Sequence, residues 1–418
     1  MHRSSMSAPD RNRPHRFELS TQLARVATDC SNCGSCVQEC LFLRKYGSPK
    51  AIAGSFDSNQ PLFLRLPFEC HLCELCTAVC PEQLNPAALF LEMRRAAFDL
   101  QGPLPAHRKL RRFEQIGTSR RYTWYGLPPD CDTVFFPGCA LAGNRPQVTL
   151  ETFDALRRLQ PKTGIVLDCC MKPSHDLGDA AHFQTMFDEM KRLLLDQGVR
   201  RLLVACPNCL KIFNRYGKEF EVATVYEMLA EQDFAGQISD EGPVVLHDPC
   251  SARFDPRQQQ AVRRLLARQG FDVQEPLHSG RTTLCCGKGA GVDGVNPEQA
   301  RGWVEKRIGE AAGLPIVSYC ASCVNAYGGH VRAAHVLDLL YPGQKPAGKQ
   351  SVVLPPCTYL NRLQVKKHLR QRLPVATDRE RGVSKDGALR SGIGLYLDKL
   401  WSRFAAWLWL RLCRQTAD

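Results

Sequence analysis

The chain has 418 residues, of which 44% are hydrophobic and 21 are cysteines, and its formal net charge is +13. This length and apolar content predict two to four packed domains and exclude global disorder. The basic excess lies mainly after residue 344, where 15 Lys and Arg accompany 5 Asp and Glu, so the remainder shows no basic face for nucleic acid. No run of about 18 apolar residues occurs, so no membrane-spanning segment is predicted.

The first residues are rich in Arg, Pro and Ser, which predicts a disordered arm over residues 1–20. They lack the apolar core of a signal peptide, so we expect a cytoplasmic location, where thiols stay reduced. Many reduced cysteines in a long chain indicate metal ligation rather than a disulfide scaffold.

The segment 21–100 carries one cysteine spacing twice, C-x2-C-x2-C-x3-C, in CSNCGSCVQEC and CHLCELCTAVCP. Two-cluster bacterial ferredoxins use this spacing, and the fourth cysteine of each run binds the other cluster. The sequence therefore predicts two 4Fe-4S cubane clusters. One is held by Cys30, Cys33, Cys36 and Cys80, and the other by Cys70, Cys73, Cys76 and Cys40. Zinc is the alternative, but its four-ligand sites fit a triple run poorly.

A linker rich in Arg, Pro and Gly is predicted over 101–130, followed by two similar halves at 131–240 and 241–345. Five cysteines of the first half recur in the second after 111 to 116 residues, which indicates an internal repeat. Apolar strands alternate with helical stretches in each half, so we expect α/β domains with parallel strands. The cysteines follow the strands, where open α/β sheets place their sites.

The first half contributes Cys139, Cys169, Cys170, Cys206 and Cys209, and the second contributes Cys250, Cys285, Cys286, Cys320 and Cys323. Adjacent cysteines rarely bond to each other, because the small ring strains both the peptide and the disulfide. Five sulfurs exceed what one zinc ion or one cubane requires, which favours a larger or unusual cluster in each half. The alternative is that one half has lost its metal and keeps its thiols for packing.

Two copies of C…CC…C-x2-C behind a two-cluster ferredoxin module resemble the cysteine-rich (CCG) family of iron–sulfur proteins, over roughly residues 21–340. That family includes heterodisulfide reductase subunits and the iron–sulfur subunits of glycolate, lactate and anaerobic glycerol-3-phosphate dehydrogenases. The resemblance implies one or two additional non-cubane 4Fe-4S clusters on the ten cysteines. The second half matches the full motif, including Gly287. In the first half Met171 replaces that glycine, which changes the pocket or leaves it without a cluster.

The residues Gly289–Gly294 spell G-x-G-x-x-G, which marks a nucleotide site when it opens a helix. Here the helix start is predicted at Asn296-Pro297, after the motif. We therefore expect the glycines to let backbone amides approach cluster sulfurs. No other flavin or nicotinamide motif occurs, so neither flavin nor NAD is expected on this chain.

The basic tail, 346–418, is predicted to end in an amphipathic helix within GIGLYLDKLWSRFAAWLWLRLCR, which holds three of the five Trp. Such a helix suits a peripheral position on the inner face of a membrane. Packing on the protein's own core or on a partner subunit is an equal alternative.

The sequence thus predicts an α+β multidomain protein, with a helical two-cluster ferredoxin module followed by two duplicated α/β cysteine-rich (CCG) domains. We expect an iron–sulfur electron-transfer subunit that links a flavoprotein dehydrogenase, or another redox subunit, to a quinone or other carrier. The tail would contact a membrane surface or a quinone-reducing partner, and no nucleic acid is expected. The alternative is a catalytic subunit that reduces a disulfide at a non-cubane cluster, and a third possibility is a zinc-dependent binding module. No acid–base catalytic residue is predicted.

Overall fold

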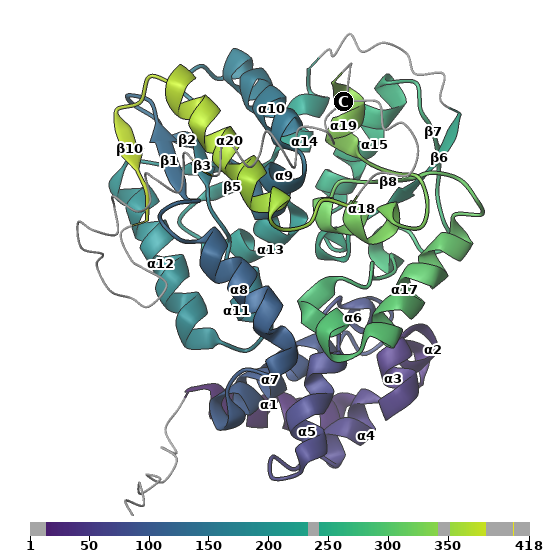
Figure 1. The fold of residues 1–418 in the computed structure, drawn as a ribbon. Coiled ribbons are helices and arrows are strands. Elements are labelled where there is room, and N and C mark those ends of the chain that lie inside the picture. The colour runs from purple at the N-terminus through teal and green to yellow at the C-terminus, as the bar shows by residue number, and fades with distance from the viewer. Residues whose placement is uncertain (1–13, 233–241, 342–351, 382–403, 405–418) are drawn as a thin grey trace, which may run out of the picture.

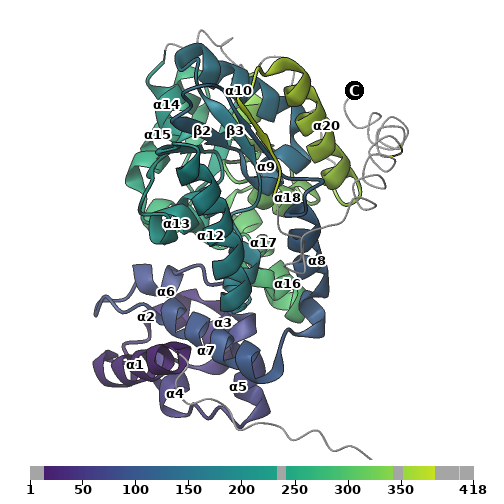
Figure 2. The same ribbon diagram turned by 90° about the vertical axis from the view of Figure 1, so that its left-hand side faces the viewer.

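The computed structural model describes residues 14–232, 242–341, 352–381 and 404. A helical module, purple in Figure 1, lies beneath two α/β domains that stand next to each other. The predicted order of one helical module followed by two α/β domains is therefore found in the structure. Figure 2 shows the same layering from the side, with the helical module below β2, β3 and the helices of the two α/β domains.

The helical module is built from short helices around a small apolar core that includes Phe42, Leu89 and Phe90. Its longest helices, α1 and α7, pack against each other. The Asn85 side chain accepts a hydrogen bond from Ala88 N and so begins α7. The helices are α1 (Pro14–Asp29), α2 (Ser35–Glu39), α3 (Leu41–Tyr46), α4 (Pro49–Gly54), α5 (Pro61–Arg65), α6 (Leu75–Ala78) and α7 (Pro86–Gln101), with a 3-10 turn, η1 (Leu66–Glu69).

The first α/β domain has a six-stranded sheet in the order β10-β1-β3-β2-β4-β5. Strands β3, β2, β4 and β5 are parallel, whereas β1 runs antiparallel to β3 and β10. The inner strands TVFF and GIVL are fully buried, as the middle of a parallel sheet requires. The strands are β1 (Trp124–Leu127), β2 (Thr133–Phe136), β3 (Gly164–Leu167), β4 (Arg201–Val204), β5 (Glu221–Thr224) and β10 (Thr377–Arg379). The helices are α9 (Gly138–Asn144), α10 (Pro146–Leu159), α11 (Lys172–Asp176), α12 (Ala180–Asp196), α13 (Pro207–Tyr216) and α14 (Val225–Ala230).

The second α/β domain has a parallel sheet in the order β7-β6-β8-β9. This order repeats β3-β2-β4-β5 strand for strand, which confirms the duplication seen in the cysteine spacing. The strands are β6 (Pro243–His247), β7 (Asp272–Gln274), β8 (Ile316–Ser318) and β9 (Ala333–His335). The helical elements are η3 (Cys250–Ala252), α15 (Pro256–Arg268), η4 (Gly280–Thr282), η5 (Gly289–Gly291), α16 (Val292–Val295), α17 (Pro297–Glu310), α18 (Ala321–Gly328) and α19 (Val336–Leu340).

The two α/β domains share one hydrophobic core, in which α14 of the first packs against α15 of the second. Two polar contacts cross the same boundary. The Tyr226 hydroxyl donates to the carbonyls of Ala205 and Tyr319 at 2.8 and 3.0 Å. Arg145 and Asp338, both buried, pair at 2.8 Å. The two halves are therefore packed together as one body.

Two predicted boundaries in the first 130 residues need correction. Helix α1 begins at Pro14, so the disordered arm predicted over 1–20 is wrong for residues 14–20, while residues 1–13 lie outside the described part. The linker predicted over 101–130 contains η2 (Pro105–His107), helix α8 (Arg108–Gly117) and strand β1. Its arginines suggested a loop, but Glu114 of α8 is buried and accepts a hydrogen bond from Ser174 N of α11 at 3.0 Å.

The tail predicted over 346–418 is partly a piece of the first domain. Helix α20 (Cys357–Arg372) lies against α9, and β10 extends the sheet beyond β1 (Figure 1). Buried Arg381 pairs with Asp168 at 2.9 Å, which fixes the end of this segment to the loop after β3. The amphipathic helix predicted near the C-terminus falls outside the described residues. Among the helices that are described, none has the length and apolarity needed to cross a membrane.

Candidate iron–sulfur sites

The first ferredoxin site is a cavity lined by Cys30, Cys33, Cys36 and Cys80, the four residues predicted to share a cluster. The loop curls round the cavity because Asn32 and Gly34 adopt the left-handed conformation, with φ of 58° and 83°. Cys33 is exposed and the other three thiols are half-buried. This site therefore reaches the surface of the helical module.

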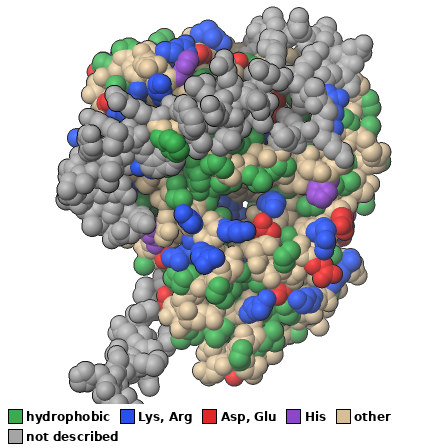
Figure 3. Space-filling view, in the orientation of Figure 1, with side chains coloured by type: hydrophobic (Ala, Val, Ile, Leu, Met, Phe, Trp, Pro, Cys, Tyr) green, Lys and Arg blue, Asp and Glu red, His purple; other side chains and the backbone are tan. Residues whose placement is uncertain are grey.

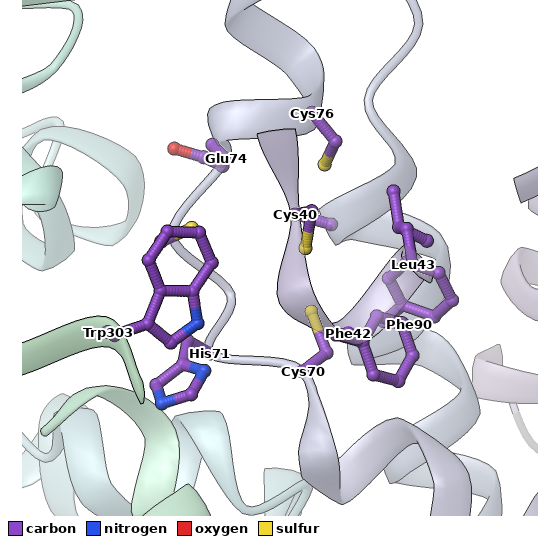
Figure 4. Close-up of a pocket in the computed structure, with 11 residues that line it drawn as sticks. Cys40, Phe42, Leu43, Cys70, His71, Glu74, Cys76, Phe90 and Trp303 are labelled. Atoms are coloured by element: carbon purple, nitrogen blue, oxygen red, sulfur yellow. The ribbon is translucent and has the colours of Figure 1, made fainter. Parts of the chain in front are cut away.

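The second ferredoxin site is lined by Cys40, Cys70, Cys73 and Cys76, again the predicted set (Figure 4). Burial, together with the Cys73 thiolate, raises the pKa of Cys70 to about 12. Burial and the neighbouring thiolates of Cys70 and Cys40 also raise the pKa of Cys76 well above its usual value. A metal centre between these buried thiols would supply the positive charge that lets them ionise together.

Two ring nitrogens at the second site support this interpretation. Trp303 of α17 and His71 line the same pocket, with ring centroids 6.3 Å apart. Figure 4 shows both rings across the pocket from Cys40, Cys70 and Cys76. Neither Trp303 Nε1 nor His71 Nε2 has a hydrogen-bond partner in the described part of the chain. An indole N–H can only donate, so the pocket offers a buried donor to an acceptor such as a cluster sulfur.

The second cysteine-rich site lies at the carboxyl end of its sheet. Cys250 follows β6, Cys320 precedes α18 and Cys323 lies on that helix, while Cys285-Cys286 come from the long loop after β7. Side-chain hydrogen bonds to Cys285 and Cys323 lower the pKa of Cys286 well below its usual value. Thiols that follow different strands therefore come within contact distance of one another at this edge of the sheet.

Gly287 explains the glycine that follows the cysteine pair. Its backbone N–H donates to Cys285 Sγ at 3.4 Å, as expected for an amide that approaches a cluster ligand. Its φ is 78°, and a Cβ there would lie 2.3 Å from the Ala300 carbonyl oxygen of α17. The position therefore requires glycine for both its conformation and the closeness of α17.

The first cysteine-rich site repeats this arrangement with the other five thiols. Cys139 lies in the first turn of α9 after β2, Cys169-Cys170 follow β3, and Cys206 and Cys209 lie at the start of α13. Side-chain hydrogen bonds to Cys169 and Cys209 lower the pKa of Cys170 to about 6. Met171 replaces the motif glycine but keeps its left-handed backbone, with φ of 60°, and its side chain is fully buried. The site geometry thus survives the loss of the glycine.

Contacts between thiols join three of the four sites, and an electrostatic interaction reaches the fourth. Cys73 of the second ferredoxin site hydrogen-bonds to Cys285 of the second cysteine-rich site. Cys320 of that site hydrogen-bonds to Cys206 of the first cysteine-rich site. Cys36 of the first ferredoxin site interacts electrostatically with Cys76 of the second. The sites therefore form one series from the exposed Cys33 to the interior.

The glycine-rich loop after Gly287 packs on the helical module and on η2, which follows it. A Cβ on Gly289 would lie 2.9 Å from the His71 carbonyl oxygen, and one on Gly294 would lie 2.7 Å from that of Ala106. The Asn296 side chain accepts from Gln299 N at 3.0 Å and begins α17, as predicted. These glycines therefore permit close packing between segments distant in the chain, which the sequence did not indicate. An amide-to-sulfur contact, which was expected of the glycines in Gly289–Gly294, is made by Gly287.

Sequence reasoning missed the arginines that join the sites. Arg94 of α7 is fully buried and donates to the carbonyls of Cys70 and Ala290 at 2.6 and 2.9 Å. Arg253 is almost fully buried and donates to the Cys73 carbonyl at 3.0 Å. Asn208, between Cys206 and Cys209, places its Nδ2 3.9 Å from Cys320 Sγ. Only Asn208 had a sequence signal, its position inside a cysteine motif.

Comparison with known proteins agrees with these sites. Residues 29–85 match the family model of the 4Fe-4S dicluster domain. Residues 133–214 and 244–326 each match the cysteine-rich domain, CCG. The matched segments contain all eighteen cysteines of the four sites.

Curated relatives are similar over much of the chain. Over 65% of its own length, this chain is 27% identical to a subunit of the "Fumarate reductase (CoM/CoB)" of Methanothermobacter marburgensis. It is 26% identical to a subunit of the "Dihydromethanophenazine:CoB--CoM heterodisulfide reductase" of Methanosarcina barkeri over 58% of its length. It is 24% identical to "EtfAB:quinone oxidoreductase" of Syntrophomonas wolfei over 64% of its length. The alignments span 60%, 66% and 44% of these relatives' own lengths. With a dicluster module, two CCG domains and these relatives, the chain belongs to the cysteine-rich CCG family of iron–sulfur proteins.

Proposed function

We propose that this chain is an iron–sulfur electron-transfer subunit of an oxidoreductase. The continuous series of thiol sites is the observation that carries the proposal. Clusters bound in these sites would supply one-electron carriage. The protein's own contribution is to hold them at neighbouring positions from its surface to the junction of its two α/β domains.

The two cubanes would be held in the crossed arrangement of two-cluster ferredoxins. Each cavity is lined by three cysteines of one run and the last cysteine of the other, Cys80 or Cys40. The exposed thiol of Cys33 makes the first site the natural contact for a flavoprotein dehydrogenase or another redox subunit. The buried second site then connects to the α/β domains through Cys73 and Cys285.

The ten remaining cysteines would hold one or two additional non-cubane 4Fe-4S clusters. The second cysteine-rich domain keeps its glycine, and the first keeps the backbone conformation of that glycine at Met171. We therefore assign a cluster to each domain. A relative named as a quinone oxidoreductase supports a quinone, or another carrier, as the second redox partner. The cytoplasmic position and membrane contact of the tail remain part of this proposal.

Disulfide reduction is the second candidate function, and two observations favour it. Two relatives are named for the CoM/CoB couple or its heterodisulfide. Cys206 and Cys250, on facing sides of the two domains, are only half-buried, and Ser251 donates to Asn208 across this boundary at 2.9 Å. Figure 3 shows a hollow near the middle of this view of the molecule. A substrate disulfide bound beside Cys206 and Cys250 would meet both cysteine-rich sites.

Anaerobic purification with iron, sulfide and zinc assays tests the proposal. Two cubanes alone give about eight irons, and filled cysteine-rich sites raise the total to about sixteen. Zinc without iron would contradict the proposal and support a zinc-binding module. Electron paramagnetic resonance during titration with a thiol and its disulfide separates the two candidate functions, because only disulfide chemistry predicts a new thiol-dependent signal.

A further inference from the structure

Six arginine side chains are buried among the described residues, and they fall into two groups. Three of them pair with carboxylates: Arg145 with Asp338, Arg307 with Glu310 and Arg381 with Asp168, at 2.8 to 3.0 Å. Arg94, Arg253 and Arg362 form no such pair in the described part of the chain, and their hydrogen bonds go to backbone carbonyls.

The unpaired arginines lie beside the cysteine sites. Arg94 donates to the Cys70 carbonyl and Arg253 donates to the Cys73 carbonyl, and both cysteines line the second ferredoxin site. Arg362 interacts electrostatically with Cys139 of the first cysteine-rich site, and its Nη1 is buried without a hydrogen-bond partner. Asp176, the carboxylate that interacts with Arg94, is already bound to Lys172 and His175.

A buried guanidinium without a counter-ion is costly, because desolvation of one charge is not repaid by carbonyl dipoles alone. A 4Fe-4S cluster with four thiolate ligands carries net negative charge. Such a cluster in the neighbouring site would compensate these arginines. Among the described residues, these three arginines form no ion pair with a carboxylate, and a cluster would supply the anion instead.

Arg253 is the best placed of the three to affect electron transfer. It follows Cys250 by three residues, and its guanidinium also binds the carbonyls of Arg281 and Thr283. It therefore stands between the second ferredoxin site and the second cysteine-rich site.

We propose that Arg94, Arg253 and Arg362 are counter-cations for the bound clusters, and that Arg253 raises the reduction potential of the cluster on Cys40, Cys70, Cys73 and Cys76. The inference rests on the proposed presence of that cluster. Reduction adds a negative charge, and a nearby buried cation stabilises the reduced form more than the oxidised form. The Arg253 charge would thus favour an electron on the cluster at the second ferredoxin site.

The first ferredoxin site offers a matched control. Lys50 donates to the Cys30 carbonyl at 3.0 Å, as Arg253 does to that of Cys73, but Lys50 is exposed to solvent. Water and salt screen an exposed charge, so its removal should leave the potential almost unchanged.

The test is a redox titration of the anaerobically purified full chain, followed by electron paramagnetic resonance. In Arg253→Met, one of the cluster midpoints should fall, so that at fixed potential the reduced-to-oxidised ratio drops on the order of tenfold. A tenfold change corresponds to 59 mV for one electron. Arg253→Lys and Lys50→Met should leave all midpoints close to those of the native chain.

Unchanged midpoints in an Arg253→Met protein with its full iron content would overturn the inference. An equal shift in Arg253→Lys would do the same, because charge would not be the cause. If Arg253→Met does not accumulate, Arg253→Gln keeps donors for the Cys73 carbonyl and must show the fall instead. Failure of the proposed function is recognised separately, because the native chain itself would then hold fewer than about eight irons.

Discussion

Gly287→Ala tests the role assigned to the glycine after the cysteine pair. The new Cβ would lie 2.3 Å from the Ala300 carbonyl oxygen and 3.2 Å from Val304 Cγ2, both on α17. A left-handed alanine costs about 1 kcal/mol, and the displacement of packed backbone costs roughly 1–3 kcal/mol more. We therefore expect a loss of roughly 2–4 kcal/mol in the free energy of unfolding, together with loss of the Gly287 N–H to Cys285 contact.

Thermal unfolding and iron content of the as-purified protein measure this effect. Gly309→Ala is the matched control on the same helix, because a Cβ there has nothing within 4 Å and φ is not left-handed. It should raise the unfolding free energy by up to about 1 kcal/mol. A Gly287→Ala protein with the melting temperature and the iron content of the native chain would contradict a steric need for glycine at this position.

Three other changes test the packing around the sites. Met171→Gly relieves about 1 kcal/mol of backbone strain but empties a fully buried position, so thermal unfolding should show a net loss of roughly 1–3 kcal/mol; a stabilised variant would contradict this. Arg145→Met leaves Asp338 buried without its cation, and denaturant unfolding should show a loss of about 3–5 kcal/mol in the free energy of unfolding. An unchanged free energy would mean that the pair does not stabilise the contact between the domains. Burial raises the pKa of Glu114 to about 7. The folded chain then holds a proton that the unfolded chain releases at lower pH, so stability falls as pH rises towards 7. Glu114→Gln should have a higher melting temperature than the native chain at pH 8, and this difference should shrink towards pH 5. A difference that does not change with pH would contradict the raised pKa of Glu114.

The cysteine sites could be predicted from the sequence because their information is local and repeated. The triple runs fixed which thiols share each ferredoxin cavity, and near-constant offsets revealed the two α/β halves. The crossed positions of Cys40 and Cys80 agree with the cavity linings.

The additions to the first domain could not be read in the same way. Strands β1 and β10 pair although Leu127 and Thr377 are 250 residues apart, and neither strand has a long apolar run. Helix α20 looked like a basic tail, yet its residues Leu360, Val365 and Leu369 are buried. Nothing in its local pattern indicates the surface that it covers.

The side chains that complete the second ferredoxin site were hidden for a similar reason. Arg94 lies in EMRRAAFDL and Trp303 in RGWVEKR, where charged neighbours suggest exposed helix faces. Their burial arises only where the helical module meets the α/β domains. Such residues are defined by the contact of segments distant in the chain, which single-sequence patterns do not encode.

The most direct test of the central claim is electron paramagnetic resonance of the reduced, anaerobically purified protein and four serine variants. If the ferredoxin cysteines hold two clusters with exchanged fourth ligands, Cys40→Ser alters the same signal as Cys70→Ser. Cys80→Ser then alters the same signal as Cys30→Ser. Pairing of Cys40→Ser with Cys30→Ser, or a native protein without any iron signal, would contradict the arrangement of sites described above.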